Sequence, residues 1–272
     1  MTAEIFTWYD AAGTATILTD GTKYNVRPGL DGRLWPEFDF ITDEQYLRAG
    51  ARVNLVKVKP RTITLPLIVY GTSATDLAAN RRVLEYAFDP MRGPGRLKVT
   101  NVDAADRYLD CYCTGWDVSE SYDTGDCRTF FMFVVTLMAP WPYWYSDTPT
   151  TTTFSAGAGW GPKNITNAGD AEAYPFWVIT PVGGTTGVVM YNSTTYTWIE
   201  IQDMSGTLPI TFITAPGNES VTDSSGVNCA GALTNTTTLF PLISGVNSIE
   251  VSYSGTAPTS VVCGFYPQYL GV

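Results

Sequence analysis

The stretch from Arg61 to Tyr145 constrains the fold most, because its pattern runs strand, helix, strand, strand. Apolar residues alternate at period two between Arg61 and Tyr70, which predicts a half-buried strand. Pro66 cannot donate a hydrogen bond to a neighbouring strand, so we expect it at a sheet edge or a bulge. A mainly β unit with a sheet and one covering helix follows from this order of elements.

The segment after this strand has the pattern of an amphipathic helix. Ser73 followed by Asp76 resembles an N-cap with an acid in the first turn, and Asp89-Pro90 ends the run. We therefore predict a helix from about Thr75 to Phe88. Its apolar side should pack on a sheet through Leu77, Leu84, Ala87 and Phe88, and the side facing away carries Asn80, Arg82 and Glu85.

Three further strands are predicted in this half of the chain. Arg96 to Thr100 alternates, and Arg107 to Cys113 has the pattern of the next strand. Phe130 to Met138 is almost continuously apolar, which predicts a strand buried on both faces.

This succession, closed by the aromatic and proline-rich run Met138 to Tyr145, resembles the N-terminal domain of siphophage distal tail proteins. The resemblance extends to the C-terminus, where Leu239 to Glu250 is similar to the family's strand pair and Phe265 to Tyr269 to its closing strand. Before Arg61 the match is loose, and Trp35 to Arg52 is an insertion or an extended arm.

The resemblance implies a structural, non-enzymatic virion protein at the tip of a long non-contractile tail. Six copies would form a ring that joins the tail tube to the baseplate hub, with the lumen continuing the DNA channel. The implied partners are further copies of the chain, the tail tube protein, the tail hub or fibre protein, and the tape measure protein. No cofactor is implied, and the C-terminal domain would be galectin-like.

Basic residues are absent from the last part of the chain. Residues 1–163 carry all 16 Lys and Arg, whereas residues 164–272 carry seven acids and no base. A domain boundary explains this break, and the Thr-, Ser- and Gly-rich stretch before it is typical of a linker. We predict a ring-forming N-terminal tail domain over residues 1–147, a linker over residues 148–169 and a β-sandwich domain over residues 170–272.

The sandwich is predicted from six short strand patterns separated by turns, with no helical pattern between them. This arrangement indicates a jelly-roll type of sandwich. The six patterns run over Phe176 to Thr180, Gly187 to Tyr191, Tyr196 to Ile201, Leu208 to Ile213, Ser248 to Tyr253 and Val261 to Tyr266.

Charge excludes two classes of partner. A C-terminal half without a cation cannot neutralise phosphates, so it should not bind nucleic acid or anionic membranes. With a net charge of −10, the protein should let DNA pass through a ring without tight binding. The N-terminus lacks a signal-peptide pattern, so we expect assembly in the bacterial host cytoplasm.

The residue types in the chain also limit which catalytic and metal sites it can form. The chain has no histidine, which removes the commonest general base. The acids between Asp117 and Asp126 suggest a glycosidase pair or a calcium site, but their Ser-, Thr- and Gly-rich context is typical of a hairpin loop. The cysteines are odd in number, so we expect free thiols and no metal at Cys111, Cys113, Cys127, Cys229 and Cys263.

Candidate site residues are of two kinds. We predict subunit contacts near Arg61, Tyr70, Arg81 and Arg82, on a strand edge and on the exposed side of the helix, although the two helix arginines equally suit plain solvated charges. The alternative function is a carbohydrate-binding or host-receptor-binding module of the tail tip. Tyr196 and Trp198 are its predicted glycan contacts, because aromatic rings offer flat apolar faces with polar edges. A sugar platform could draw on any of the aromatic residues of this half, although at alternating strand positions such residues more often belong to a sandwich core. They are Trp177, Tyr191, Tyr196, Trp198, Tyr253, Tyr266 and Tyr269.

Overall fold

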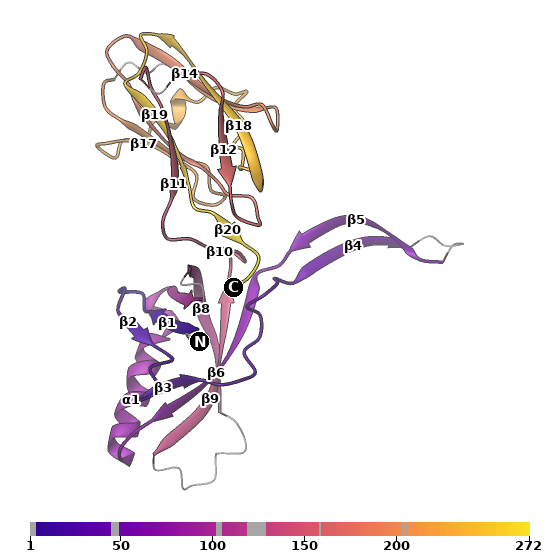
Figure 1. Ribbon diagram of the computed structural model, residues 1–272, viewed down its shortest axis with the longest axis vertical. Coiled ribbons are helices and arrows are strands. Elements are labelled where there is room, and N and C mark those ends of the chain that lie inside the picture. Colours follow the sequence, from indigo (N-terminus) through magenta and orange to yellow (C-terminus); the bar gives the residue numbers. More distant parts are fainter. Residues whose placement is uncertain are drawn as a thin grey trace. The chain divides into compact units, whose positions relative to one another are not determined.

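The chain folds into two compact units, each built from antiparallel strands (Figure 1). The first comprises Met1–Asp147 with Tyr269–Val272, and the second comprises Thr148–Gln268. The computed structural model describes residues 4–44, 49–101, 105–118, 129–157, 159–202, 204 and 206–272. Within these residues there is one α-helix, α1 (Ala74–Ala87), so the mainly β prediction with one helix is confirmed.

The first unit is built on an open antiparallel sheet, a half-barrel with strand order β2-β1-β7-β8-β9-β6-β3. A short strand, β10, adds to it by pairing with β8. All the strands predicted between residues 61 and 138 form, and they are neighbours in this sheet. The bounds are β1 (Ile5–Tyr9), β2 (Ala15–Ile17), β3 (Tyr24–Val26), β6 (Arg61–Tyr70), β7 (Gly95–Thr100), β8 (Asp106–Val118), β9 (Phe130–Ala139) and β10 (Trp144–Tyr145).

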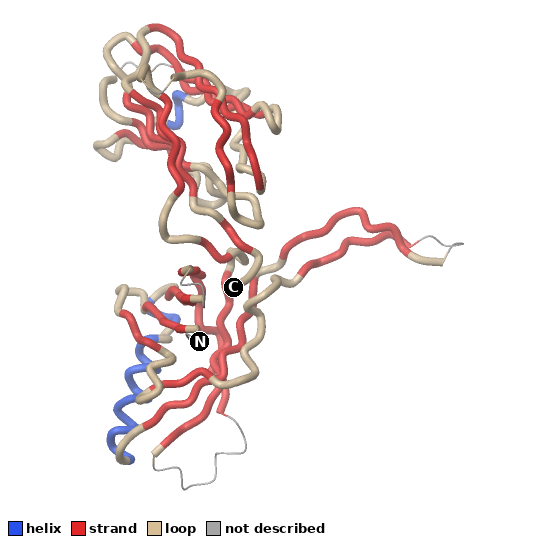
Figure 2. The backbone as a smooth tube through the Cα atoms, viewed as in Figure 1, coloured by secondary structure: helices blue, strands red, loops and turns tan. Residues whose placement is uncertain are grey.

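Helix α1 lies on one face of this sheet, as Figure 2 shows. The Ser73 side chain accepts a hydrogen bond from the Asp76 backbone N–H, so the predicted N-cap is confirmed. The predicted apolar side is buried, with Leu84 fully covered. The prediction for Asn80 is wrong: its side chain is buried and donates to the Tyr70 carbonyl oxygen over 2.9 Å.

An aromatic contact ties the helix to the sheet. The Trp8 indole N–H donates to the Ala87 carbonyl oxygen over 2.7 Å, and its ring stacks on Phe88 with centroids 4.5 Å apart. A Cβ at Gly95 would lie 2.1 Å from the Trp8 ring, so this strand position must remain glycine.

Two predictions about strand positions are wrong. Strand β6 is not an edge, because it pairs with β9 along its whole length and with β3 at one end. The backbone N–H groups of Thr64 and Tyr70 point toward the side of β6 on which β3 lies. The nitrogen of Pro66 points to the same side, so the donor that it lacks falls just beyond the end of β3. Strand β9 is fully buried on one face only, since Phe133 and Val135 are covered whereas Val134 is half-buried.

A separate hairpin is formed by β4 (Phe38–Glu44) and β5 (Ala51–Val58), inserted between β3 and β6. In the described part of the chain these two strands pair only with each other (Figure 2). Most of their residues are exposed. This hairpin overlaps the region from Trp35 to Arg52, where an insertion or extended arm was expected.

The second unit contains two antiparallel sheets whose buried residues form one core. Their strand orders are β11-β19-β13-β16-β17 and β12-β18-β14-β15. All six predicted strands form, and the galectin-like or jelly-roll class stays a prediction. The bounds are β11 (Thr150–Phe154), β12 (Lys163–Asn167), β13 (Phe176–Thr180), β14 (Thr185–Asn192), β15 (Thr197–Gln202), β16 (Ile210–Ile213), β17 (Ser220–Asp223), β18 (Gly245–Gly255) and β19 (Ser260–Phe265), with β20 (Gln268–Tyr269) at the return to the first unit.

The predicted linker over residues 148–169 is wrong for most of its length. Strand β11 pairs with β19 and strand β12 pairs with β18, so both belong to the second unit. Threonine and asparagine dominate them, and single apolar residues, Phe154 and Ile165, carry the core contact. The predicted end of the second domain is also wrong, because Tyr269–Val272 belongs to the first unit.

These corrected boundaries predict how fragments of the second unit behave. A fragment of residues 148–268 should unfold cooperatively on heating. A fragment of residues 170–272 should melt at a lower temperature, because it lacks the two edge strands and the buried Phe154 and Ile165. Circular dichroism of both fragments measures this, and equal thermal midpoints would contradict the assignment of β11 and β12.

The four described cysteines, Cys111, Cys113, Cys229 and Cys263, are unpaired, and Cys127 lies outside the described residues. Burial raises the pKa of the Cys111 and Cys263 thiols, so both stay protonated.

In the described residues, no helix has the length and apolarity that crossing a membrane requires.

Candidate functional site

Arg61 is an internal residue of the first unit, so its side chain is not exposed to another subunit, and a subunit contact near it stays a prediction. Its side chain is 1% exposed. Nε donates to the Pro142 carbonyl oxygen over 2.6 Å and Nη1 to that of Gly32 over 2.6 Å, while Nη2 donates to that of Leu270. The guanidinium carbon also lies 5.9 Å from the centroid of the Trp144 ring.

Arg61 remains positively charged at neutral pH although it is buried. Desolvation lowers the pKa of the guanidinium to about 10, which is still well above neutral pH. A buried cation is tolerated only with hydrogen-bonding partners, and here three carbonyl groups supply them. Arg61 therefore joins three distant segments of the unit.

Tyr70 and Arg81 lie at the opposite end of strand β6 from Arg61, roughly 30 Å away at about 3.3 Å per residue. Tyr70 is half-buried opposite Phe130. Arg81 pairs with Glu85 through Nε and Oε1 at 2.7 Å, and its guanidinium carbon lies 5.0 Å from the Phe131 ring centroid. The structure thus brings Tyr70 and Arg81 to one end of the sheet.

Arg82 is exposed on helix α1, next to a shallow hollow lined by Ala74, Ala78 and Ala79. Apolar side chains are exposed nearby on the same helix, with Val83 at 52% and Tyr86 at 57%. The interface roles of Tyr70, Arg81 and Arg82 stay predictions.

Tyr196 ends the turn that connects β14 to β15, and Trp198 is the second residue of β15. Tyr196 is 76% exposed and has a φ of +57°, the one positive φ among the described non-glycine residues. Trp198 is 39% exposed and lies opposite Tyr191 across the hairpin. Exposed aromatic rings on neighbouring positions are available to a ligand, and the predicted glycan role stays a prediction.

The other aromatic residues considered for a sugar platform have different environments. Trp177 is fully buried in the core, where it makes an edge contact with Phe240. Tyr253 and Tyr266 are 40% and 41% exposed, and each contacts another aromatic ring of the second unit. For Trp177 the core alternative is therefore correct.

The sequence patterns did not identify an exposed apolar surface on the first unit. We define the hairpin patch as the exposed apolar residues of β4 and β5, which are Phe40, Ile41, Val53, Leu55 and Val56, with exposures between 41% and 57%. Phe40 is paired with Val56 and Ile41 with Leu55. Because successive pairs point to opposite faces, both faces of the hairpin are apolar.

No described group of three or more Cys, Asp or Glu residues is arranged to hold a metal ion. The acidic segment considered for glycosidase or calcium chemistry lies outside the described residues from Ser119 onward. Asp117 and Val118 of this segment belong to strand β8.

Comparison with solved structures shows the same fold along the whole chain. The Dit protein (gp 19.1) of phage SPP1, described as a paradigm of the hub adsorption apparatus in phages infecting Gram-positive bacteria, matches with a TM-score of 0.74 and 17% identity. The match covers 99% of this chain and 100% of that chain. Chains from the phage P2 baseplate in its activated conformation, with Ca and with Sr, match with TM-scores of 0.59 and 11% identity, covering 97% of this chain and 98% of those chains.

No protein-family model matches the chain, and no curated protein matches its sequence. At these identities the likeness establishes the fold, so the resemblance to distal tail proteins noted from the sequence is confirmed at that level.

Proposed function

We propose that this protein is a structural component of a siphophage tail tip, in which six copies form a ring joining the tail tube to the baseplate hub. The lumen of the ring continues the DNA channel. The observation that carries this proposal is the match over essentially the full length of both chains to a hub protein of a phage adsorption apparatus. Both units take part in that match, so the whole chain and not one shared domain supports it.

The hairpin patch supports assembly on physical grounds. A two-stranded hairpin is marginally stable alone in water, and here both faces expose apolar side chains. Contact with another subunit removes this surface from water, and each large apolar side chain that becomes fully buried contributes about 1.5–3 kcal/mol. We therefore assign the hairpin patch to the contact between neighbouring subunits.

A closed ring needs two different contact surfaces on each subunit, because head-to-tail contacts join unlike patches. We assign the second surface to the exposed side of α1 and the segment that follows it. Val83 and Tyr86 are more than half exposed, and Met91 is 92% exposed. Arg81, Arg82 and Tyr70 lie near this surface and would border the contact.

The charge of the protein suits a channel for DNA. The net charge is −10, so a lumen lined by this chain would lack the excess of Lys and Arg side chains that binds the phosphates of duplex DNA. DNA would pass without tight binding. The proposed neighbours along the tail are the tail tube protein, the hub or fibre protein and the tape measure protein, and the work of the protein is done by these contacts rather than by catalysis.

Negative-stain electron microscopy of the purified full-length protein tests the proposal. We expect ring-shaped particles with sixfold symmetry at micromolar protein concentration. Sedimentation at the same concentration should give the mass of six chains. A protein that stays monomeric at all concentrations up to the solubility limit would refute ring formation by the chain alone.

A second candidate function is binding of a host-surface glycan by the second unit. The specific observation is the exposed pair Tyr196 and Trp198, with Tyr196 held at a φ that costs a non-glycine residue free energy. Strained residues are concentrated at functional sites. Glycan-array binding that is lost in Trp198→Ala would favour this function.

A further inference from the structure

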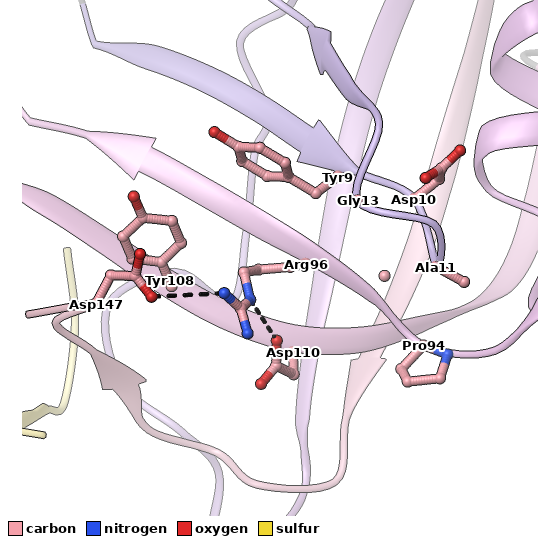
Figure 3. A pocket seen from close by; sticks show the side chains of 10 residues that line it. Tyr9, Asp10, Ala11, Gly13, Pro94, Arg96, Tyr108, Asp110 and Asp147 are labelled. Atoms are coloured by element: carbon pink, nitrogen blue, oxygen red, sulfur yellow. Dashed lines mark hydrogen bonds and ion pairs between the residues drawn. The ribbon is translucent and has the colours of Figure 1, made fainter.

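A polar cavity of about 520 Å³ lies on the first unit, on the sheet face opposite the buried core (Figure 3). Three of its lining residues come from neighbouring strands in register, since Tyr9 of β1 pairs with Arg96 of β7, which pairs with Asp110 of β8. Tyr108 and Asp147 also line the cavity, together with Asp10, Ala11, Gly13, Pro94 and Gly95. The volume falls in the usual range for small-molecule sites, roughly 300–1,000 Å³.

The polar groups of this cavity are held in place before any ligand binds. Arg96 Nε lies 2.9 Å from Asp110 Oδ1, and Arg96 Nη1 lies 3.5 Å from Asp147 Oδ1. The Tyr145 hydroxyl donates to Asp110, with both carboxylate oxygens within 3.1 Å. The guanidinium carbon of Arg96 is 5.8 Å from the Tyr108 ring centroid, which also restrains it. Such preorganisation lowers the entropy cost of binding.

The lining combines donors, acceptors and aromatic faces. Arg96 supplies N–H donors, and Asp110 and Asp147 supply acceptors. In the described residues the hydroxyls of Tyr9 and Tyr108 have no hydrogen-bond partner, so both are available to a ligand. The Tyr108 and Tyr145 rings are stacked with centroids 6.0 Å apart.

This mixture discriminates between ligand classes. A simple anion would face the two carboxylates, and a simple cation would face Arg96, so each meets a repelling charge. A neutral ligand that carries several hydroxyls can donate to the carboxylates, accept from Arg96 and pack its C–H surface on the tyrosine rings. We propose that this cavity of the first unit binds a neutral saccharide of one or two rings. The site is separate from Tyr196 and Trp198 of the second unit and does not depend on ring formation.

Saturation-transfer NMR on the full-length protein tests the proposal, because the method suits large assemblies and weak ligands. The probes are glucose, galactose, rhamnose, N-acetylglucosamine, maltose and cellobiose, with methylguanidinium and sulfate as charged competitors. We expect at least one sugar to give a saturable signal. Tyr108→Ala should weaken its binding about tenfold, because ring packing and a hydroxyl contact are lost together.

Two conservative variants keep the test valid if Tyr108→Ala unfolds. Tyr108→Phe keeps the ring and removes the hydroxyl, and Asp147→Asn changes an exposed carboxylate whose contact with Arg96 is long, at 3.5 Å. Each should weaken sugar binding about threefold, as expected for one hydrogen bond. Val227→Ala is the control, because Val227 is an exposed residue of the second unit that belongs to none of the proposed sites, and it should leave this signal unchanged.

Three results would overturn the assignment. The first is the absence of a signal from every sugar in the panel. The second is a sugar signal that is insensitive to all three cavity variants. The third is saturable binding of methylguanidinium or sulfate at the cavity while no sugar binds.

Discussion

Replacing Phe40 or Leu55 by Asp should prevent ring assembly while leaving both units folded. Phe40 and Leu55 are 57% and 48% exposed and belong to successive pairs on opposite faces of the hairpin. Neither is part of the core of the first unit, so a charge there does not disturb folding. In a ring, each substitution removes apolar burial of about 1.5–3 kcal/mol and places a carboxylate in the contact.

A loss of about 3 kcal/mol per contact corresponds to roughly a hundredfold change in an association constant. The concentration at which rings form should therefore rise by at least about two orders of magnitude, measured by sedimentation and microscopy. Thr151→Asp is the matched control, because Thr151 is exposed on β11 of the second unit and the change adds the same charge outside the hairpin patch. Thr151→Asp should assemble normally.

If Phe40→Asp and Leu55→Asp both assemble at the wild-type concentration, the hairpin patch is not a subunit contact. The ring itself is tested separately by the wild-type particles. A wild-type ring that tolerates both substitutions would move the contact to another surface and leave the ring proposal intact.

The second large effect is expected at Arg61. Arg61→Ala removes the donors from the carbonyl groups of Gly32, Pro142 and Leu270 and leaves a buried space. Unpaired buried carbonyls cost about 1–3 kcal/mol each, and relaxation and water entry reduce the sum. We expect the first unit to lose about 4 kcal/mol of unfolding free energy, a large fraction of the stability of an ordinary domain.

Chemical denaturation followed by tryptophan fluorescence measures this loss, because Trp144 lies beside the guanidinium. Arg61→Lys should recover part of the stability, since an ammonium keeps the charge but cannot reproduce the planar fork of donors. Arg81→Ala is the matched control, because Arg81 is exposed and its ion pair with Glu85 contributes at most about 0.5 kcal/mol. Equal losses for Arg61→Ala and Arg81→Ala would show that the three carbonyls do not depend on Arg61.

Much of the fold was predictable because it follows from local patterns. Strand β6 shows period-two alternation, and α1 has a cap at Ser73 and an apolar side. The predictions failed where the local pattern is weak. The strands at 150–154 and 163–167 are rich in threonine and asparagine and resemble loops, because one inward residue each is enough when neighbouring strands supply the core.

The site residues were less predictable, because a side chain's environment depends on segments far apart in the sequence. Arg61 has the same phase in the strand as Ile63 and Leu65, so the pattern places it on the apolar face. Nothing near it in the sequence indicates its partners, which are Gly32, Pro142 and Leu270. The hairpin patch was not predicted, because apolar residues in a strand normally indicate burial. Only the structure shows that these two strands are uncovered.

The sequence by itself determined the mainly β class, the single helix, most of the strands, the charge break between the two halves and the resemblance to distal tail proteins. These properties depend on residues within one element or on composition. Only the tertiary structure decided that Arg61 is internal, that the hairpin patch is uncovered and that Tyr9, Arg96 and Asp110 share one cavity wall. The physical reason is that these three outcomes depend on strand register and on contacts between segments that are tens to hundreds of residues apart. A local sequence pattern carries no information about such contacts.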